Sequence, residues 1–357
     1  MTRSDIISLL GSEEATLLLD HVCEKVPRSS IATPSLDTVR TVFRSANRSF
    51  TVLKNLMRLY QSGRLAGTGY LSIFPVDQAL EHTAGYSFAA NPRYFDPETI
   101  IEMAVQGECS GVASSAGVLG LVSKKYASRI PLIVKLNHSE HLSIPDQTNQ
   151  IMFSSVKQAA EMGAVAVGAT VYFGSDLSHR QITEIAEAFE TAHSLGLATI
   201  LWCYPRNQNY KTVKVDYASS VDLTAQAIHL GVTLGADIVK QKMPTATFAF
   251  KSLNFSKYSD EMYIKLMTKH PIDLVRYQVL HAYTGKISLL NSGGEASNSA
   301  NLQDDLKSAV RAAIINKRGG GAGLIMGRKV FKRSMTEGAQ ILRAVQDVYL
   351  SPDVTIA

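Results

Sequence analysis

Residues 164–205 read "AVAVGATVYFGSDLSHRQITEIAEAFETAHSLGLATILWCYP", and this stretch decides the fold. Its two ends, 164–173 and 198–205, are short runs rich in small and β-branched apolar residues, which is typical of buried strands. Between them, residues 178–196 carry apolar side chains at helical spacing and end at a glycine. A strand, a helix and a second strand in this order predict a parallel βαβ unit.

The same unit recurs along the chain from Gly69 onward. The predicted strands are 69–77, 111–115, 131–137, 164–173, 198–205, 236–243, 287–293 and 322–328. Eight strands that alternate with helices predict an α/β fold, the (β/α)8 or TIM barrel. A doubly wound sheet is the alternative, but no GxGxxG turn follows the first strand, as a dinucleotide-binding version would require.

Two segments lie outside this repeat. Residues 1–67 have helical apolar spacing and are predicted to form an N-terminal helical extension. Residues 68–357 then form the barrel domain. Within it, residues 244–272 after the sixth strand are too long for an ordinary βα loop. This insert is expected to form either a lid over a site or a contact between subunits.

The composition indicates a folded protein. Of 357 residues, 45% are hydrophobic and 19% are charged, and the net charge of +5 is spread along the chain. This charge favours small anionic ligands, and no basic run supports binding to nucleic acid. Cys23, Cys109 and Cys203 are too scattered for a disulfide framework or a CxxC metal site, which predicts a cytoplasmic setting. Neither a signal peptide nor a membrane span is expected.

Polar residues stand at the carboxyl ends of the predicted strands, where barrels carry their catalytic groups. These residues are Asp77, Lys135 with Asn137, Trp202 with Tyr204, Lys240 with Lys242, Ser292 with Gly293 and Gly294, and Gly327 with Arg328. A spacing of two keeps a pair on one face of its strand. Residues of the opposite parity, such as Cys203 and Gln241, are then expected to face the helices.

The loops after strands seven and eight read "NSGGEAS" and "IMGRKVF". These are the two positions at which barrels most often bind phosphate, through backbone N–H groups and a helix N-terminus. Glycines let an anion approach the backbone, Ser292 supplies a hydroxyl and Arg328 supplies a guanidinium. A phosphorylated small molecule is therefore the expected ligand.

The stretch "GADIVKQKM", residues 235–243, brings two lysines to the same rim. A lysine beside a phosphate site serves either as a point charge or as a nucleophile toward a carbonyl. A nucleophilic amine must be neutral, so its pKa must fall by several units from the reference value of about 10.4. Partial burial and the cationic neighbours Lys242, Lys135 and Arg328 would push the pKa of Lys240 in that direction.

Imine chemistry also needs acid and base groups, and the strand ends offer several. Asp77 and Tyr204 are of suitable types, and Trp202 would wall the pocket on the same face as Tyr204. Ordinary core packing is the competing interpretation for the two aromatic residues, and a turn cap is the competing interpretation for Asp77.

A catalytic metal is not expected. The nine histidines are scattered, and the only close pair is His138 and His141. Zinc sites need three or four convergent ligands. His82 is interpreted as a pocket group.

The motifs together resemble a known family. In order they are "VDQALEH", "VKLN", "AVAVGATVYFGS", "LWCYPR", "GADIVKQKM", "NSGG" and "GLIMGRKVF". From about residue 66 onward the chain is similar to archaeal-type class I fructose-bisphosphate aldolases, in particular to the longer bacterial form. The resemblance implies a lyase of glycolysis and gluconeogenesis that uses a Schiff base, needs no metal or other cofactor, and assembles as a homo-oligomer.

The resemblance also implies roles for particular residues. Lys240 corresponds to the Schiff-base lysine, and Asp77 to a catalytic aspartate near the imine carbon. Trp202 and Tyr204 correspond to the catalytic aromatic pair of the fifth strand, with the tyrosine as acid/base residue. The phosphate of the dihydroxyacetone-phosphate half would be bound by Ser292, Gly293, Gly294, Gly327 and Arg328. Arg206 matches a residue near the other phosphate, with Lys242 as a lesser candidate.

The chain departs from the family at two places. The first strand is followed by "DQALEH", with Gln78 and Ala79 where archaeal members often have His and Gly, and "YPR" continues as "NQNYK" rather than with glycines. These departures put the contacts to the distal phosphate in question. Two alternatives stay open: a Schiff-base or transaldolase-like enzyme for another phosphorylated ketose, and a non-catalytic phosphosugar-binding protein.

Overall fold

The computed structural model describes residues 1–77, 83–140, 142, 149–294 and 301–357. At its centre, eight parallel strands form a closed barrel in the order β1-β10-β9-β8-β7-β6-β3-β2. The strands are β1 (Leu71–Val76), β2 (Gly111–Ser115), β3 (Leu132–Lys135), β6 (Ala166–Phe173), β7 (Ala198–Pro205), β8 (Ile238–Gln241), β9 (Ser288–Ser292) and β10 (Gly323–Ile325). The predicted barrel and its eight strands are confirmed.

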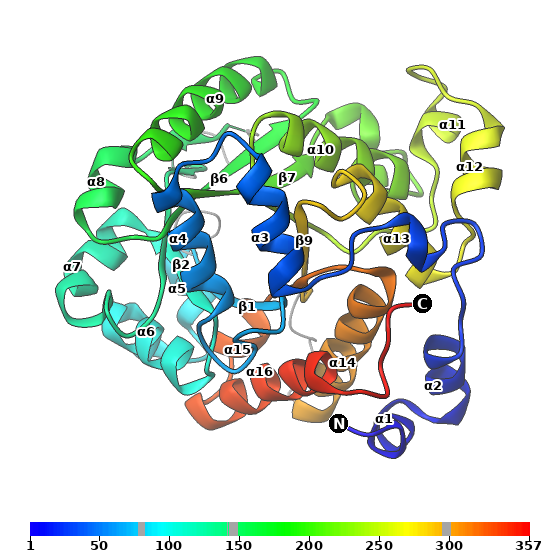
Figure 1. The fold of residues 1–357 in the computed structure, drawn as a ribbon, viewed down its shortest axis with the longest axis horizontal. Coiled ribbons are helices and arrows are strands. Elements are labelled where there is room, and N and C mark those ends of the chain that lie inside the picture. The colour runs from blue at the N-terminus through cyan, green and yellow to red at the C-terminus, as the bar shows by residue number, and fades with distance from the viewer. Residues whose placement is uncertain (78–82, 141, 143–148, 295–300) are drawn as a thin grey trace.

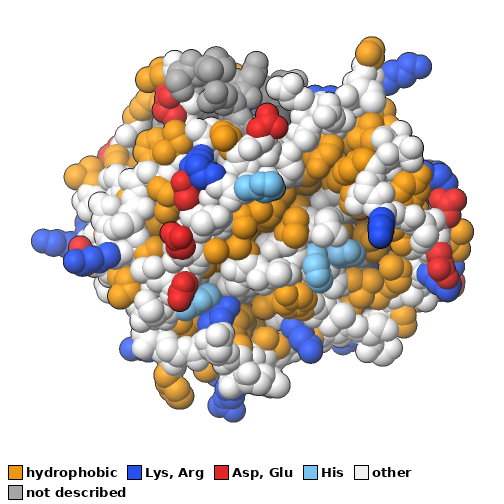
Figure 2. All heavy atoms as spheres, turned by 90° about the horizontal axis from the view of Figure 1, so that it is seen from above, with side chains coloured by type: hydrophobic (Ala, Val, Ile, Leu, Met, Phe, Trp, Pro, Cys, Tyr) orange, Lys and Arg blue, Asp and Glu red, His pale blue; other side chains and the backbone are white. Residues whose placement is uncertain are grey.

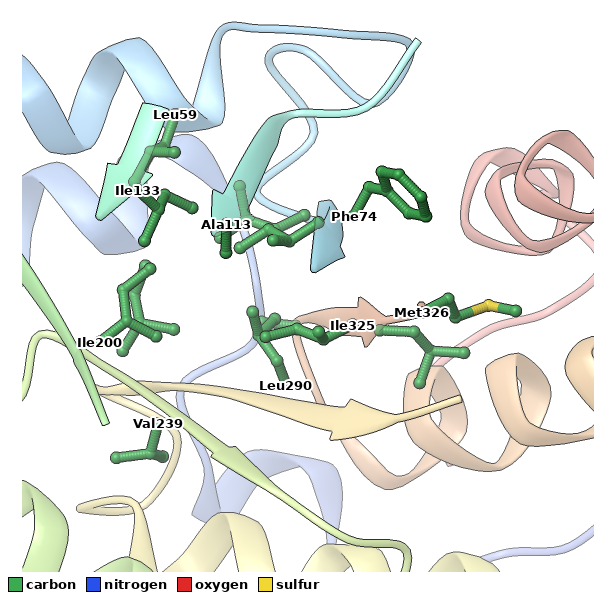
Figure 3. Close-up of a cluster of buried hydrophobic side chains, with 14 of the residues drawn as sticks. Leu59, Phe74, Ala113, Ile133, Ile200, Val239, Leu290, Ile325 and Met326 are labelled. Carbon is green, nitrogen blue, oxygen red and sulfur yellow. The ribbon is translucent and has the colours of Figure 1, made fainter. Parts of the chain in front are cut away.

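Side chains alternate between the barrel interior and the helix layer, as the strand period of two requires. In Figure 3, Ala113, Ile200 and Leu290 converge inside the barrel, whereas Phe74 and Met326 point outward. All five are buried, the first three by one another inside the barrel and the last two by the helices that cover the outside of the sheet. Both faces of each strand are therefore buried, which explains why the strands are continuous apolar runs in the sequence.

The predicted third strand is shorter than expected. It ends at Lys135, and Asn137–His138 (β4) pairs instead with Ile151–Met152 (β5) in a separate two-stranded antiparallel sheet. The Asn137 side chain both donates to the carbonyl of Thr170 and accepts from its N–H, each at 2.7 Å. Asn137 thus binds the backbone of strand β6. The prediction that Asn137 and Lys135 lie on one face of the same strand is wrong, because that strand ends at Lys135.

Helices surround the barrel in the order that the repeat predicts (Figure 1). The longer ones are α6 (Pro97–Gln106), α7 (Ala116–Tyr126), α9 (Ser178–Ser194), α10 (Val221–Thr233), α13 (Pro271–His281), α14 (Leu302–Gly319) and α16 (Met335–Leu350). The shorter ones are α5 (Ala84–Phe88), α8 (Val156–Glu161) and α15 (Arg328–Phe331). Side-chain caps set several starts: Ser115 accepts from the N–H of Val118 at α7, and Asp96 caps α6 just before Pro97. No helix in the described part of the chain is long and apolar enough to cross a membrane.

Four helices precede the first strand: α1 (Arg3–Leu10), α2 (Ser12–Leu19), α3 (Leu36–Ser45) and α4 (Phe50–Tyr60). Helix α4 packs on the amino ends of the strands. There the hydroxyl of Tyr60 donates to Ser288 at 2.6 Å, and Leu59, which is fully buried, lies against Gly111 at the start of β2. The N-terminal helices share one apolar core with the barrel. A domain boundary at residue 67 stays a prediction.

The buried side chain of Leu59 gives a stability prediction. Leu59→Ala should lower the free energy of unfolding by about 2–5 kcal/mol, because it removes buried methyl groups and leaves a cavity under the barrel. Leu17→Ala, at a 53% exposed position of α2, should change it by less than about 0.5 kcal/mol. Chemical denaturation of the unmodified protein and of both variants would measure these free energies of unfolding. Equal effects would mean that α4 is not part of the barrel core.

The insert 244–272 contains α11 (Ala249–Leu253) and α12 (Asp260–Leu266), between β8 and α13. The buried carboxylate of Asp222 in α10 ties it down by accepting the N–H groups of Ala249 and Phe250 and the hydroxyl of Tyr263. Tyr263 also belongs to a small apolar cluster on α10 and α13. This anchoring places the insert on the outer helix layer; the expectation of a lid or a subunit contact stays a prediction.

Candidate active site

The carboxyl ends of the strands enclose two adjoining cavities of about 380 and 70 Å3. Lys240, Arg328 and the segment 292–294 line both. Of the predicted site residues that the structure describes, all but Arg206 and Lys135 line one or the other. His82, together with Gln78, Ala79 and His141, lies outside the described residues. A further cavity of about 430 Å3 lies between the insert and α10 and has no predicted site residue in its lining.

Lys240 stands at the junction of the two cavities. Strand β8 pairs with β7 so that Lys240 lies beside Trp202. The Nζ of Lys240 is hydrogen-bonded to the hydroxyl of Tyr204, and it lies 5.7 and 5.0 Å from the ring centroids of Trp202 and Tyr204. Gln241, next along the strand, points the other way and donates to the carbonyl of Cys203 in the helix-facing layer. The amine of Lys240 thus contacts the hydroxyl of Tyr204 and lies beside the aromatic rings of Trp202 and Tyr204.

Trp202 reaches its position because the neighbouring strand gives it room. A Cβ at Gly168 of β6 would lie 2.7 Å from the indole ring, too close for any side chain. The ring is 2% exposed, and its faces meet two ammonium groups, those of Lys240 and Lys135, the latter at 5.1 Å. Trp202 is therefore both buried and part of the pocket wall, so the two interpretations of this residue do not exclude each other.

Asp77 and Lys135 form a buried ion pair at the end of β1 and β3. The Nζ of Lys135 lies 3.2 Å from Oδ2 of Asp77, and Lys135 is 1% exposed. Burial alone would raise the pKa of Asp77, but the ammonium groups of Lys135 and Lys240 outweigh it and hold the pKa below its usual value. Asp77 is therefore an ionised acceptor at neutral pH. The sequence predicted Lys135 as a cationic neighbour of Lys240. In the structure, the ammonium of Lys135 forms an ion pair with Asp77.

The loops after β9 and β10 meet beside the cavity that Arg328 lines. A Cβ at Gly293 would lie 2.3 Å from Cγ of Met326, and one at Gly327 would lie 2.6 Å from the carbonyl oxygen of Pro75. Gly294 has a φ of 80°, which favours glycine. Gly293 therefore lets the two loops pack closely against each other, and Gly327 lets the second loop pack against β1. The N–H of Gly293 is used within the sheet, where it donates to the carbonyl of Ile325.

A second cationic group lies beside Tyr204. The guanidinium of Arg206 is 5.3 Å from the ring centroid of Tyr172 and 5.8 Å from that of Tyr204. Lys242 lines the larger cavity, and its burial, helped by the nearby Arg206, lowers its pKa to about 8. Arg206 and Lys242 are thus close enough to interact electrostatically, and two neighbouring cations favour an anionic ligand.

Two residues of this site were missed in the sequence. Tyr172 pairs in register with Tyr204, and its parity in "VYF" was a usable signal. Lys329 lines the larger cavity, is 5% exposed, and directly follows Arg328 in "GRKVF". It lies on the short helix α15 and not on a strand, so the rule of alternate strand residues did not select it.

Among the described residues, one group of His, Cys and Asp side chains is spaced closely enough to hold a metal ion: His21, Cys23 and Asp273. None of them lines the cavities around Lys240. His138 is fully buried behind the site, with Nε2 3.2 Å from the carbonyl oxygen of Lys135. On the face shown in Figure 2, Lys and Arg side chains are interspersed with Asp and Glu and form no continuous basic stripe.

Comparison with known proteins gives consistent matches. The sequence model of the DeoC/LacD family aldolases matches residues 71–333. The chain is 53% identical over 352 residues, 99% of each protein, to the "Probable fructose-bisphosphate aldolase class 1" of Chlamydia trachomatis. It is 28% identical over 277 residues to the fructose-bisphosphate aldolase class 1 of Halobacterium salinarum, covering 78% of this chain and 90% of the relative.

Solved structures agree with these sequence matches. An archaeal fructose-1,6-bisphosphate aldolase, with its catalytic lysine covalently bound to the carbinolamine intermediate of the substrate, superimposes with a TM-score of 0.62 at 26% identity. The match covers 82% of this chain and 98% of that one. The fructose-bisphosphate aldolase of Slackia heliotrinireducens has a TM-score of 0.67 at 23% identity, covering 93% and 91%, and supports the fold.

Proposed function

The chain belongs to the DeoC/LacD family of aldolases, and on that premise we propose how its residues carry out the reaction of a class I fructose-bisphosphate aldolase. The protein is such an aldolase and works through a Schiff base. It cleaves fructose 1,6-bisphosphate reversibly to dihydroxyacetone phosphate and glyceraldehyde 3-phosphate. The observation that supports our assignment of residues is the hydrogen bond between Lys240 and Tyr204 beside the glycine loops.

Lys240 is the nucleophile. Its neutral amine attacks the C2 ketone, and loss of water from the carbinolamine leaves a protonated imine. When the C3–C4 bond breaks, the electron pair moves into the imine as an enamine, and the C4 hydroxyl loses its proton as the aldehyde forms. Protonation at C3 and hydrolysis then release dihydroxyacetone phosphate and restore the amine. The iminium supplies the polarisation that a metal supplies in other aldolases.

Tyr204 is the acid/base residue, because its hydroxyl already contacts the amine at which the carbinolamine proton moves. Asp77 acts as a carboxylate, since its ion pair with Lys135 keeps it ionised. It is suited to accept a proton or to orient a substrate hydroxyl, and not to donate a proton. Trp202 excludes water from one side of the imine.

The two phosphates bind on either side of Lys240. Ser292, Gly294, Gly327 and Arg328 bind the phosphate of the dihydroxyacetone half, and Gly293 lets the loop approach closely. Arg206 and Lys242 bind the distal phosphate. Their mutual proximity supports this assignment, because two cations that repel each other are stabilised together by a dianion.

Lys242 gives a prediction about pH. Since the pKa of Lys242 is lowered to about 8, its ammonium form is present at pH 7 and is lost as the pH rises through about 8. Lys242→Met should raise the KM for fructose 1,6-bisphosphate roughly 10- to 100-fold at pH 7. The ratio of kcat/KM between the unmodified protein and the variant should fall between pH 7 and pH 9.5.

Fructose 1-phosphate, which lacks the distal phosphate, is the control for this experiment. With it, the ratio of kcat/KM should stay near one throughout the pH range. An equal loss on both substrates would place Lys242 elsewhere than at the distal phosphate.

Steady-state cleavage of fructose 1,6-bisphosphate with and without a chelator tests the proposed function. We expect activity that the chelator does not change, and borohydride reduction in the presence of dihydroxyacetone phosphate should add one reduced triose phosphate to Lys240. An adduct with poor cleavage of fructose 1,6-bisphosphate would favour another phosphorylated ketose. No adduct at all would favour a phosphosugar-binding protein, and inactivation by the chelator would contradict the mechanism.

We also propose a cytoplasmic, homo-oligomeric enzyme. All three cysteines are free and buried, which suits a reducing compartment. Light scattering of the full chain, and of a chain without residues 1–67, would measure the assembly state and the contribution of the N-terminal helices to it.

A further inference from the structure

Lys329 has an unusual environment for a lysine. Its side chain is buried at the base of the phosphate loops, and its Nζ donates to the carbonyl of Gly293 at 2.9 Å and to Oγ of Ser308 in α14 at 2.6 Å. Both partners are neutral. Among the described residues, no carboxylate oxygen lies within 4 Å of this ammonium.

The acidic group that acts on Lys329 electrostatically, Asp305, is already paired with another cation. Asp305, whose side chain is fully buried, accepts from Nε of Arg333 at 3.1 Å and from its terminal nitrogen at 2.7 Å. Burial lowers the pKa of Lys329, and Asp305 offsets this only in part. A buried cation whose hydrogen-bond partners are neutral is unfavourable until an anion comes close.

The geometry leaves Lys329 one way to meet such an anion. An ammonium has three N–H donors, and Gly293 and Ser308 take two of them. Lys329 lines the larger cavity together with Arg328, and its Nζ lies 3.5 Å from the position that a Cβ of Gly294 would occupy. The third donor is therefore within reach of an anion held over Gly294.

The loop itself needs such a cation. The N–H of Gly293 donates to the carbonyl of Ile325, so Gly293 has no backbone donor left for a phosphate, and its carbonyl accepts from Lys329. Side chains must then supply more of the positive charge than in a loop that binds through backbone N–H groups.

We propose that Lys329 is a substrate-binding residue that contacts the phosphate of the dihydroxyacetone half from beneath the glycine loop, as the second cation of that subsite after Arg328. This inference rests on the proposed function. Ser308 and the carbonyl of Gly293 hold the ammonium in place, so the charge is in position before the substrate arrives.

The experiment compares Lys329→Met with Lys307→Met. Methionine keeps the length of the side chain and removes the charge, and Lys307 is an exposed residue of α14, next to Ser308, whose loss changes the net charge equally. Lys329→Met should raise the KM for fructose 1,6-bisphosphate and the inhibition constant of inorganic phosphate roughly 10- to 100-fold, with kcat within about threefold. Lys307→Met should leave these values unchanged.

Borohydride trapping separates this inference from the proposed function. Unphosphorylated dihydroxyacetone at high concentration should be trapped equally on Lys240 in both proteins, whereas dihydroxyacetone phosphate should need at least about tenfold more ligand in Lys329→Met. Unchanged KM and phosphate inhibition would overturn the role of Lys329. Failure of the unmodified protein to form either adduct would instead overturn the aldolase assignment.

If Lys329→Met does not fold, Ser308→Ala is the alternative variant. It removes one hydrogen-bond acceptor of the Lys329 ammonium and keeps the charge of that ammonium. We expect a rise in KM of roughly two- to tenfold with kcat retained. Lys329→Arg in the same series should recover part of the phosphate affinity lost in Lys329→Met. A Ser308→Ala protein with unaltered KM and phosphate inhibition would contradict the proposal.

Discussion

Lys240→Met should abolish turnover, with a fall in kcat on the order of 10⁴-fold or more. Without an amine at this position no imine forms, and the C3–C4 bond then lacks an electron sink. Borohydride with dihydroxyacetone phosphate should leave no stable adduct on the variant, as measured by the intact mass of the protein. The fold should persist, because methionine can fill the space between Trp202 and Tyr204 without a buried charge.

Lys242→Met is the matched control, since it removes a lysine two positions away, just past the end of β8, that lines the same cavity. Its imine should still form, so that the adduct appears on Lys240 while the KM rises. If an adduct appeared in the Lys240→Met protein, Lys240 would not be the Schiff-base lysine, and Lys242, Lys135 and Lys329 would be the candidates that line or adjoin the site.

Tyr204→Phe should lower kcat by roughly 10²- to 10⁴-fold and change the KM much less. The hydroxyl that contacts Lys240 is the group expected to move protons at the carbinolamine and at the C4 hydroxyl. The phenyl ring keeps its place beside the amine and beneath Arg206, so substrate binding should survive. The imine should still be trapped by borohydride, but more slowly than in the unmodified protein.

Tyr172→Phe is the control for Tyr204→Phe. Tyr172 pairs with Tyr204 in register and lies under the same guanidinium. The Tyr172→Phe variant also lacks one hydroxyl, but its kcat should stay within roughly threefold of that of the unmodified protein. This is a difference of less than about 1 kcal/mol in the activation free energy. If both variants lost kcat equally, the effect would come from the aromatic wall as a whole and not from proton transfer by Tyr204.

The ion pair of Asp77 and Lys135 indicates which of the two acid/base candidates, Asp77 and Tyr204, can donate a proton. A carboxylate held in its ionised form by two ammonium groups is a poor proton donor at neutral pH. Tyr204 carries a hydroxyl that can both donate and accept a hydrogen, and this hydroxyl contacts the amine of Lys240. We therefore expect Tyr204 to donate the proton, and Asp77 to accept a proton or to orient the substrate.

The sequence by itself predicted the architecture and brought most candidate site residues to one rim of the barrel. Eight apolar runs alternating with helical patterns predicted the barrel, and the two-residue spacing of Trp202 with Tyr204 brought a pair to the rim. These signals are local, because periods of 2.0 and 3.6 are properties of neighbouring residues. The two glycine loops at that rim were also recognisable, since glycine has conformational uses that other residues lack.

Only the tertiary structure decided which of these groups contact one another. It paired Lys135 with Asp77, turned Asn137 toward β6, brought Lys329 under Gly293, and used the N–H of Gly293 within the sheet. Each contact joins residues from different strands or helices, and depends on the barrel's register and on how its loops pack. The partners of a charge are set by this geometry, and a pattern along one strand carries no information about it.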